Sequence, residues 1–215
     1  MAKVLVTGAG GFVGSNLVDS LLSDGHEVFG IDNFCTGIPA NIAHLTDDKN
    51  FTFIEQDIIA GLGDFESLKF DQIFHMASPA SPPHYMRLAI ETMHVNTTAT
   101  ELLLQHATKH GSRLLFASTS EIYGDPHEHP QRESYWGNVN PIGPRSIYDE
   151  AKRFGETFMS HFHRIEKTDT TIVRIFNTYG PRMDPDDGRV VSSFIRDAIK
   201  GKPFQVFGDG TQTRS

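Results

Sequence analysis

Short apolar runs alternate with helix-like patterns along most of the chain. These runs predict six short β-strands separated by helices or turn-rich connections. Strands that alternate with helices are typical of a parallel sheet covered on both faces, so we expect an α/β protein with a doubly wound sheet. The strands are expected over residues 3–7, 27–31, 51–54, 72–77, 113–117 and 171–176.

Apolar residues at helical spacing predict four helices between or after these strands. The first is expected over residues 12–23, where Asp24 and Gly25 end it. A long second helix is expected over residues 87–110, and Gly111 closes it in the way that helices often end. The last two helices are expected over residues 148–165 and 190–200.

Two segments interrupt this alternation. Residues 125–145 contain four prolines and no periodicity, which predicts a long loop of a kind that is often functional. After Gly180 the pattern becomes irregular, with the last helix and a strand near residues 204–207. We therefore expect one domain over residues 1–180 and the beginning of a smaller lobe over residues 181–215.

The composition is that of a water-soluble protein with enough apolar residues for a core. The 215 residues are 38% hydrophobic and 21% charged, and 19 Lys and Arg against 27 Asp and Glu give a net charge of −8. This acidic balance argues against nucleic acid and anionic membranes as partners, and no apolar stretch is long enough to span a membrane. Cys35 is the single cysteine, which excludes an intrachain disulfide and favours a reducing, cytoplasmic location. Paired histidines lack cysteine or carboxylate neighbours at zinc spacing, so no metal site is expected.

A glycine-rich stretch follows the first expected strand and opens the first helix. Gly8, Gly11 and Gly14 allow backbone N–H groups to approach a pyrophosphate at the helix N-terminus, although glycines in an ordinary tight turn are the alternative. Asp32 ends the second strand at the distance where a carboxylate binds the adenosine ribose hydroxyls. No arginine stands beside it, since Asn33 follows, so NAD is favoured over NADP. The stretch therefore predicts a Rossmann-type, NAD-binding domain.

Two polar groups lie where such a sheet binds ligands. Tyr148 and Lys152 share one helix face, and an ammonium near a phenol lowers the tyrosine pKa, as a general base requires. Residues 118–121 follow the fifth strand, and open α/β sheets bind ligands at the carboxyl ends of their strands. The alternatives are a solvated helix face for the first group and a polar strand end for the second. Asp57, just past the third strand, either contacts the adenine or caps a helix.

These motifs together resemble the extended short-chain dehydrogenase/reductase family. Longer strings resemble the UDP-glucuronic acid decarboxylases within it, and the resemblance covers essentially the whole chain. It implies an NAD-dependent decarboxylation of UDP-glucuronate to UDP-xylose through a 4-keto sugar, with the cofactor regenerated. Family members continue beyond Arg214 and complete the substrate lobe, so we expect a C-terminal truncation. The strings are residues 77–85, 135–145, 174–182, 187–191 and 208–215.

The resemblance also implies roles for individual residues. Tyr148 takes the proton of the sugar C4 hydroxyl, Lys152 holds the nicotinamide ribose, and Thr119 binds the C4 oxygen. Ser120 and Glu121 lie at the C5/C6 end of the sugar. The expected cofactor contacts are Gly8, Gly11, Phe12, Val13, Gly14, Asp32, Asn33, Thr36, Gly37, Asp57, Ile58, Ala77, Tyr148 and Lys152. The expected substrate contacts are Pro79, Ser81, Tyr85, Asn177, Arg189 and Arg214.

Related activities differ from this one by few residues. Related 4,6-dehydratases carry an aspartate where Ser120 stands, and related 4-epimerases usually lack the carboxylate of Glu121, so this pair favours decarboxylation. The alternatives are an NAD-dependent nucleotide-sugar epimerase or dehydratase, or a truncated NAD-binding module without turnover. The family also implies a homodimer through a four-helix bundle, formed here by the helices expected over residues 87–110 and 148–165.

Overall fold

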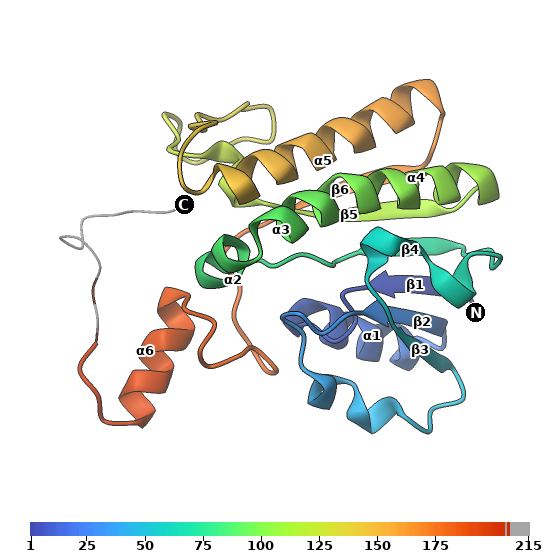
Figure 1. Ribbon diagram of the computed structural model, residues 1–215, viewed down its shortest axis with the longest axis horizontal. Helices are drawn as coiled ribbons and strands as arrows, with labels where there is room; N and C mark the ends of the chain where they lie inside the picture. The colour runs from blue at the N-terminus through green and yellow to red at the C-terminus, as the bar shows by residue number, and fades with distance from the viewer. Residues whose placement is uncertain (205, 207–215) are drawn as a thin grey trace.

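A computed structural model of the protein describes residues 1–204 and 206, and one six-stranded parallel sheet organises this part of the chain (Figure 1). The strand order is β3-β2-β1-β4-β5-β6, which is the expected doubly wound arrangement. The order reverses between β1 and β4, and ligands bind beyond the carboxyl ends of strands at such a point. The strands are β1 (Lys3–Thr7), β2 (Glu27–Asp32), β3 (Phe51–Glu55), β4 (Gln72–His75), β5 (Arg113–Thr119) and β6 (Thr170–Ile175).

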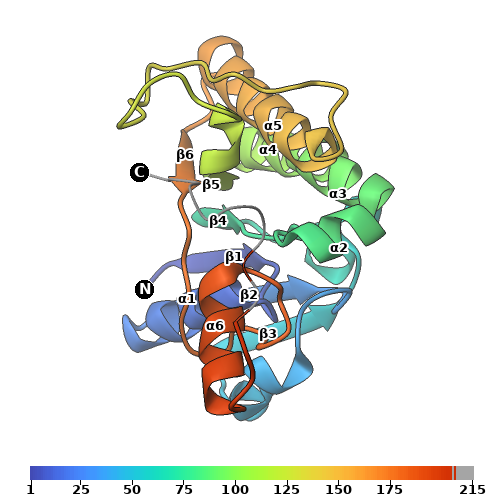
Figure 2. The same ribbon diagram turned by 90° about the vertical axis from the view of Figure 1, so that its left-hand side faces the viewer.

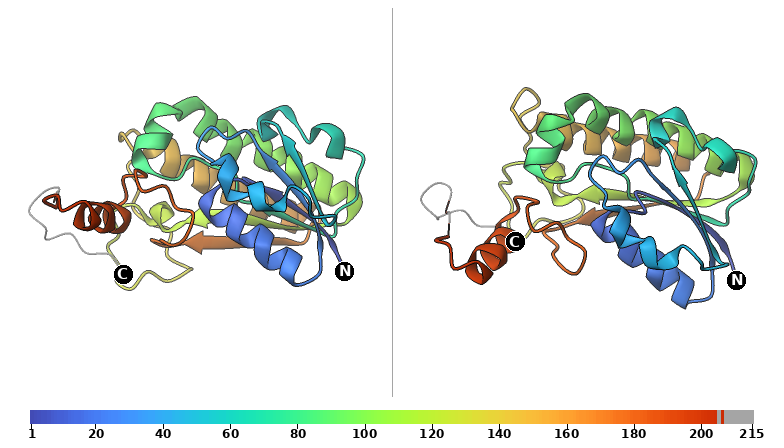
Figure 3. Two further views of the ribbon diagram at one scale, coloured as in Figure 1. Left: turned by 90° about the horizontal axis from the view of Figure 1, so that it is seen from below. Right: turned by 60° about the horizontal axis from the view of Figure 1, so that its bottom comes forward.

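Helices cover both faces of the sheet. The helix α1 lies on one face, and α3, α4 and α5 lie on the other (Figure 3). The sixth helix, α6, lies outside both layers, on the side toward which β6 points. The α-helices are α1 (Phe12–Ser23), α2 (Pro82–Arg87), α3 (Ala89–Asn96), α4 (Thr98–His110), α5 (Ser146–Ile165) and α6 (Val190–Ile199). Short 3-10 helices are η1 (Pro39–Asn41), η2 (Ala43–Leu45), η3 (Ile58–Ala60), η4 (Gly63–Phe65) and η5 (Ser120–Tyr123).

Alternate residues of the strands form two separate cores. In β1, Val4 and Val6 join the core beneath α1, whereas Leu5 joins the core beneath α4 and α5. All three side chains are fully buried. This division follows from the two-residue period of a strand, and it explains why β1 is apolar without interruption.

The stretch expected over residues 87–110 is helical and ends at Gly111, but it is not one continuous helix: α2 ends at Arg87, and the rest divides into α3 and α4. The interruptions fall at Leu88, whose backbone leaves helical geometry with a ψ of 50°, and at Thr97, whose φ is −117°. The Thr97 hydroxyl donates to the Met93 carbonyl (2.8 Å), and the Thr92 hydroxyl donates to the Leu88 carbonyl (2.7 Å). Threonine hydroxyls that bond the carbonyl four residues back often bend helices, but Thr100 and Thr108 make the same bond within the unbroken α4, so these bonds accompany the interruptions without accounting for them.

The other expected elements agree with the structure to within two residues at each end, apart from the last strand. Residues 124–145 form the expected long connection, with one isolated bridge between Gly124 and Asn138. This connection and α6 lie at opposite sides of the molecule (Figure 2). A strand over residues 204–207 is not observed at Phe204 or Val206, which belong to no strand, and residues 205 and 207 lie outside the described residues.

A fully buried histidine joins β4 to α3 and to the end of β1. His75 Nε2 lies 3.0 Å from the Val95 carbonyl oxygen and must donate to it, so Nδ1 accepts from the Thr7 hydroxyl at 2.8 Å. Thr7 Oγ1 in turn accepts the Ala77 N–H (3.3 Å). Burial, with the nearby Lys152 charge, lowers the pKa of His75 to about 3.

Because the pKa of His75 is lowered in the folded protein, we expect the free energy of unfolding to fall in acid. The unfolded chain binds a proton at His75 below about pH 6.5, whereas the folded chain resists it down to about pH 3. The stability contributed by neutral His75 is therefore complete above pH 6.5 and falls with pH by about 1.4 kcal/mol per unit.

Urea unfolding near pH 7 and near pH 5 measures the contribution of His75 to the free energy of unfolding. Between them we expect His75→Gln to lose about 2 kcal/mol less of its unfolding free energy than the wild type. Glutamine keeps a donor and an acceptor but does not titrate. Parallel losses in the two proteins would show that His75 does not sense the pH.

Candidate active site

The glycine loop brings the backbone of β1 and α1 into close contact. Gly8 has a φ of 72°, and a Cβ there would lie 2.8 Å from the backbone of Ala77. A Cβ on Gly14 would lie 2.0 Å from the Gly8 carbonyl oxygen. Gly11 begins α1, and among the described residues no side chain caps this helix and no acid stands in its first turn. The N-terminus of α1 is thus open to an anion, as the sequence predicts.

The Asp32 carboxylate, at the end of β2, holds the glycine loop by accepting backbone hydrogen bonds. Its Oδ2 accepts the Gly10 N–H (2.9 Å) and its Oδ1 accepts the Phe34 N–H (2.8 Å). Burial raises the pKa of Asp32, and these backbone donors oppose the rise. Asp57 accepts the Ile59 N–H (2.9 Å) as the cap of η3, and it also accepts from the Asn33 side chain (3.2 Å).

Replacing Asp32 is expected to weaken NAD binding. Asp32→Ala removes the carboxylate and frees the Gly10 and Phe34 N–H groups, so we expect at least about a tenfold loss of affinity in a calorimetric titration with NAD. Asp32→Asn keeps one acceptor and is expected to lose less. An unaltered affinity in Asp32→Ala would show that the ribose contact is misassigned.

Two adjoining cavities lie at the carboxyl end of the sheet. They share lining at Gly8, Gly11, Thr36 and Ser78, and the larger has a volume of about 410 Å³. Every residue expected to contact the cofactor lines one of them. The smaller cavity is lined by Asp32, Asn33, Gly37, Asp57, Ile58 and Ala77, and the larger by Phe12, Val13, Gly14, Tyr148 and Lys152.

Tyr148 and Lys152 lie side by side near the start of α5. The Lys152 ammonium is 5.8 Å from the centre of the Tyr148 ring and donates to the Ala117 carbonyl (2.6 Å). Tyr148 stacks on Tyr85, with ring centres 4.9 Å apart. The expected lowering of the tyrosine pKa is wrong for this structure, because burial raises the pKa of Tyr148 to about 12. Burial likewise lowers the pKa of Lys152 to about 7.

The end of β5 supplies the other expected catalytic residues. Thr119, Ser120 and Glu121 all line the larger cavity. Thr119 accepts the Glu121 N–H (3.2 Å) as the cap of η5, and its side chain favours the ionised form of Tyr148 by hydrogen bonding, which opposes the rise in pKa. Glu121 accepts a hydrogen bond from Arg145, the N-cap residue of α5. Strand β5 and helix α5 therefore place the expected acid–base groups around one space.

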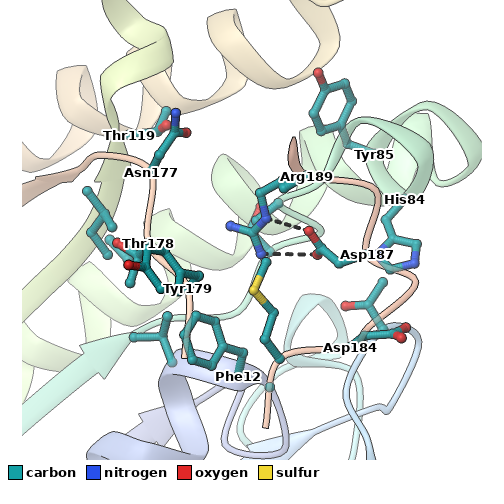
Figure 4. A pocket seen from close by; sticks show the side chains of 18 of the residues that line it. Phe12, His84, Tyr85, Thr119, Asn177, Thr178, Tyr179, Asp184, Asp187 and Arg189 are labelled. Carbon is teal, nitrogen blue, oxygen red and sulfur yellow. Dashed lines mark hydrogen bonds and ion pairs between the residues drawn. The ribbon is translucent and has the colours of Figure 1, made fainter. Parts of the chain in front are cut away.

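Two expected substrate residues come from the segment after β6 (Figure 4). Asn177 lies beside Thr119, and Arg189 lies opposite, beside Asp187. Both oxygens of Asp187 accept from Arg189, at 2.5 Å from Nε and 3.0 Å from Nη2. Tyr85, from α2, completes this side of the cavity. Helices α2 and α6 thus line the larger cavity together with residues at the carboxyl ends of the strands.

Of the expected substrate residues that the structure describes, two do not line this cavity. Ser81 precedes α2, is 1% exposed and lines neither cavity. Pro79 lines the smaller cavity instead of the larger. Arg214 lies outside the described residues.

The structure adds residues that were not assigned a role from the sequence. Arg145 pairs with Glu121, and Asp187 pairs with Arg189. Arg182 donates to Ser15 and Asp19 of α1, which fixes the segment after β6 against that helix. For Arg145 a signal exists, because a residue three positions before Tyr148 shares its helix face. No comparable sequence signal marks Asp187 or Arg182. Among the described residues, no cluster of three His, Cys, Asp or Glu can hold a metal ion.

The chain resembles curated proteins over nearly all of its own length. UDP-glucuronic acid decarboxylase 1 of Xenopus tropicalis is 51% identical over 213 residues, which are 99% of this chain and 50% of that protein. Its Arabidopsis thaliana counterpart is 51% identical over 99% of this chain and 48% of that protein, so the chain spans about half the length of these curated relatives.

Solved structures and a family model extend the comparison. A UDP-glucuronic acid 4-epimerase from Bacillus cereus, solved with UDP-glucuronic acid and NAD, has a TM-score of 0.81 and 32% identity, over 98% of this chain and 67% of that one. A UDP-N-acetylglucosamine 4-epimerase from Methanobrevibacter ruminantium has a TM-score of 0.86 and 31% identity, over 98% and 67% of the two chains. The model of the NAD dependent epimerase/dehydratase family matches residues 4–215, and the chain belongs to that family.

Proposed function

We propose that the protein uses NAD to convert UDP-glucuronate to UDP-xylose and CO₂. The observation that carries this proposal is the shared cavity of Tyr148, Thr119 and Glu121, which adjoins the cavity at Asp32. One site thus offers a proton acceptor, a donor for the C4 oxygen and a carboxylate near the cofactor site. The relatives named UDP-glucuronic acid decarboxylase support the choice of substrate.

The residues present fit NAD. The open N-terminus of α1 suits the pyrophosphate, and the tight Gly8–Gly14 contact keeps side chains out of its path. Asp32, which lines the smaller cavity, would hold the adenosine ribose, and Lys152 would hold the nicotinamide ribose. When bound, NAD⁺ accepts the hydride from C4 of the sugar and later returns it.

The side chains of the larger cavity would manage the protons. Tyr148 takes the proton of the C4 hydroxyl in its ionised form, which hydrogen bonding by Thr119 favours, while Thr119 holds the same C4 oxygen. The resulting ketone lies β to the C6 carboxylate, so the bond to CO₂ breaks with its electrons delocalised into the carbonyl. Proton delivery to C5 then completes the pentose, and Ser120 and Glu121 would lie at that end of the sugar. The serine at position 120 favours decarboxylation over the elimination of water, for which related dehydratases use an acid there.

Product analysis tests this proposal. The protein is incubated with UDP-glucuronate and NAD⁺, and the nucleotide sugar is followed by mass spectrometry together with CO₂ release. We expect a UDP-pentose and one CO₂ for each sugar consumed. A UDP-hexuronate of unchanged mass that separates from UDP-glucuronate in liquid chromatography would instead indicate a 4-epimerase. NAD binding without any product would indicate that residues 1–215 bind the cofactor but do not support turnover.

The arrangement of helices supports two further parts of the proposal. We propose a homodimer in which α3 and α5 pair with their copies as a four-helix bundle, because Ile90, Met93 and Phe154 on these helices are at least 37% exposed. Sedimentation of the wild type and of Phe154→Glu would test this homodimer.

We also propose a Rossmann domain over residues 1–180 and a substrate lobe that begins at residue 181, since α6 lies outside both helical layers. None of the described helices is long and apolar enough to cross a membrane.

A further inference from the structure

A guanidinium group lies against the carboxylate that we place at the C5/C6 end of the sugar. Nη2 of Arg145 donates to Oε2 of Glu121, and both residues line the larger cavity. The Arg145 side chain is 45% exposed, compared with 16% for Glu121. The guanidinium therefore retains a surface that a ligand in the cavity can reach.

The start of α5 couples this guanidinium to the proposed base. The Arg145 carbonyl accepts the N–H groups of Tyr148 (3.0 Å) and Asp149 (3.2 Å), so Arg145 is the N-cap residue from which the first turn of α5 leads to Tyr148. Burial raises the pKa of Tyr85, whose ring stacks on Tyr148, and the Arg145 charge opposes that rise. Arg145, Tyr85 and Tyr148 thus surround the same part of the cavity.

The other arginine and lysine side chains that line the cavity pair with groups other than Glu121. Arg189 is held by both oxygens of Asp187, and Arg182 donates to Asp19 and to the Ser15 carbonyl. Lys152 is 3% exposed and donates to the Ala117 carbonyl. Within the described residues, Arg145 is therefore the arginine that this cavity places beside Glu121.

A substrate with a C6 carboxylate creates an electrostatic problem at this position. Two carboxylates close together in a partly buried site repel each other unless a cation lies between them. A guanidinium solves the problem, since its planar set of five N–H groups can serve two carboxylates at once. A neutral hexose would not require this cation.

We propose that Arg145 bridges Glu121 and the C6 carboxylate of the sugar, and thereby makes the site prefer an acidic to a neutral hexose. This inference rests on the proposed function, because it requires a uronic acid in the cavity. It assigns Arg145 to substrate specificity, separately from the proton transfers of Tyr148. It also explains how Glu121 can face an anionic substrate.

Calorimetric binding of two sugars to the NAD-loaded protein tests this inference. In Arg145→Met we expect the affinity for UDP-glucuronate to fall about tenfold to a hundredfold, as for the loss of a charge-assisted hydrogen bond. The affinity for neutral UDP-glucose should change by less than about twofold. Arg145→Lys keeps the positive charge but loses the planar set of N–H donors. Its affinity for UDP-glucuronate should therefore lie between those of the wild type and Arg145→Met. Arg164→Met makes the same change in the last turn of α5 and should leave both affinities unaltered.

The double variant Glu121→Gln with Arg145→Met separates direct from indirect action. If Arg145 touches the sugar carboxylate, UDP-glucuronate binding stays weak when Glu121 is neutral. Recovered binding would show that Arg145 only compensates Glu121, and equal losses for both sugars would show a merely structural role; either result overturns the inference. A wild type that favours UDP-glucose would contradict the proposed substrate itself. A wild type that favours UDP-glucuronate, with the same preference in Arg145→Met, would contradict only the role of Arg145.

Discussion

Replacing Tyr148 with phenylalanine is expected to reduce the turnover of UDP-glucuronate roughly a thousandfold or more, the contribution typical of a positioned general base. The variant loses only the phenolic hydroxyl. The ring can keep its stack on Tyr85 and its place beneath Lys152, so the fold and the affinity for NAD should remain close to those of the wild type. Single-turnover formation of NADH on mixing with UDP-glucuronate measures the step directly.

The stacked neighbour provides the matched control. Tyr85→Phe removes a hydroxyl from a ring whose plane lies within 8° of that of Tyr148, in the same cavity. If Tyr148 is the proton acceptor, NADH formation in Tyr85→Phe falls far less than in Tyr148→Phe. Equal losses would mean that the two tyrosines cannot be assigned separate roles. Unchanged turnover in Tyr148→Phe would remove this residue from the mechanism.

Local rules account for most of what could be predicted of the fold. Gly111 has a φ of 70° and ends α4, as a glycine does when it closes a helix. The alternation of Val4, Leu5 and Val6 between two cores follows from strand geometry alone. In contrast, the interruptions at Leu88 and Thr97 leave the helix-like apolar pattern of residues 87–110 intact, so that pattern does not locate them.

The sequence predicts the lining of the two cavities better than it predicts their electrostatics. The strand–glycine–helix order and the position of Asp32 place the expected cofactor residues around two cavities. However, the pKa of Tyr148 depends on burial, which two residues four apart on a helix do not reveal. The pairing of Arg145 with Glu121 crosses the long 124–145 connection, so only the folded chain brings the two residues together.

Replacing Gly14 with alanine is expected to damage cofactor binding and stability together. A Cβ at this position would lie 2.0 Å from the oxygen and 2.8 Å from the carbon of the Gly8 carbonyl, and 3.2 Å from Cα of Ala9. These are backbone atoms, so no rotamer change relieves the clash, and α1 must move away from the loop. We expect a loss of about 1–3 kcal/mol in unfolding free energy, as for other overpacked sites.

Displacement of α1 should also misalign its N-terminus, and we expect NAD affinity to fall about tenfold to a hundredfold. Gly25→Ala is the matched control, because this glycine follows the other end of α1 and an added Cβ there meets no atom within 4 Å. Its φ of 79° predicts some strain and a modest loss of stability, with no change in NAD affinity. Equal NAD affinities for Gly14→Ala and the wild type would show that the cofactor does not depend on this close approach of helix and strand.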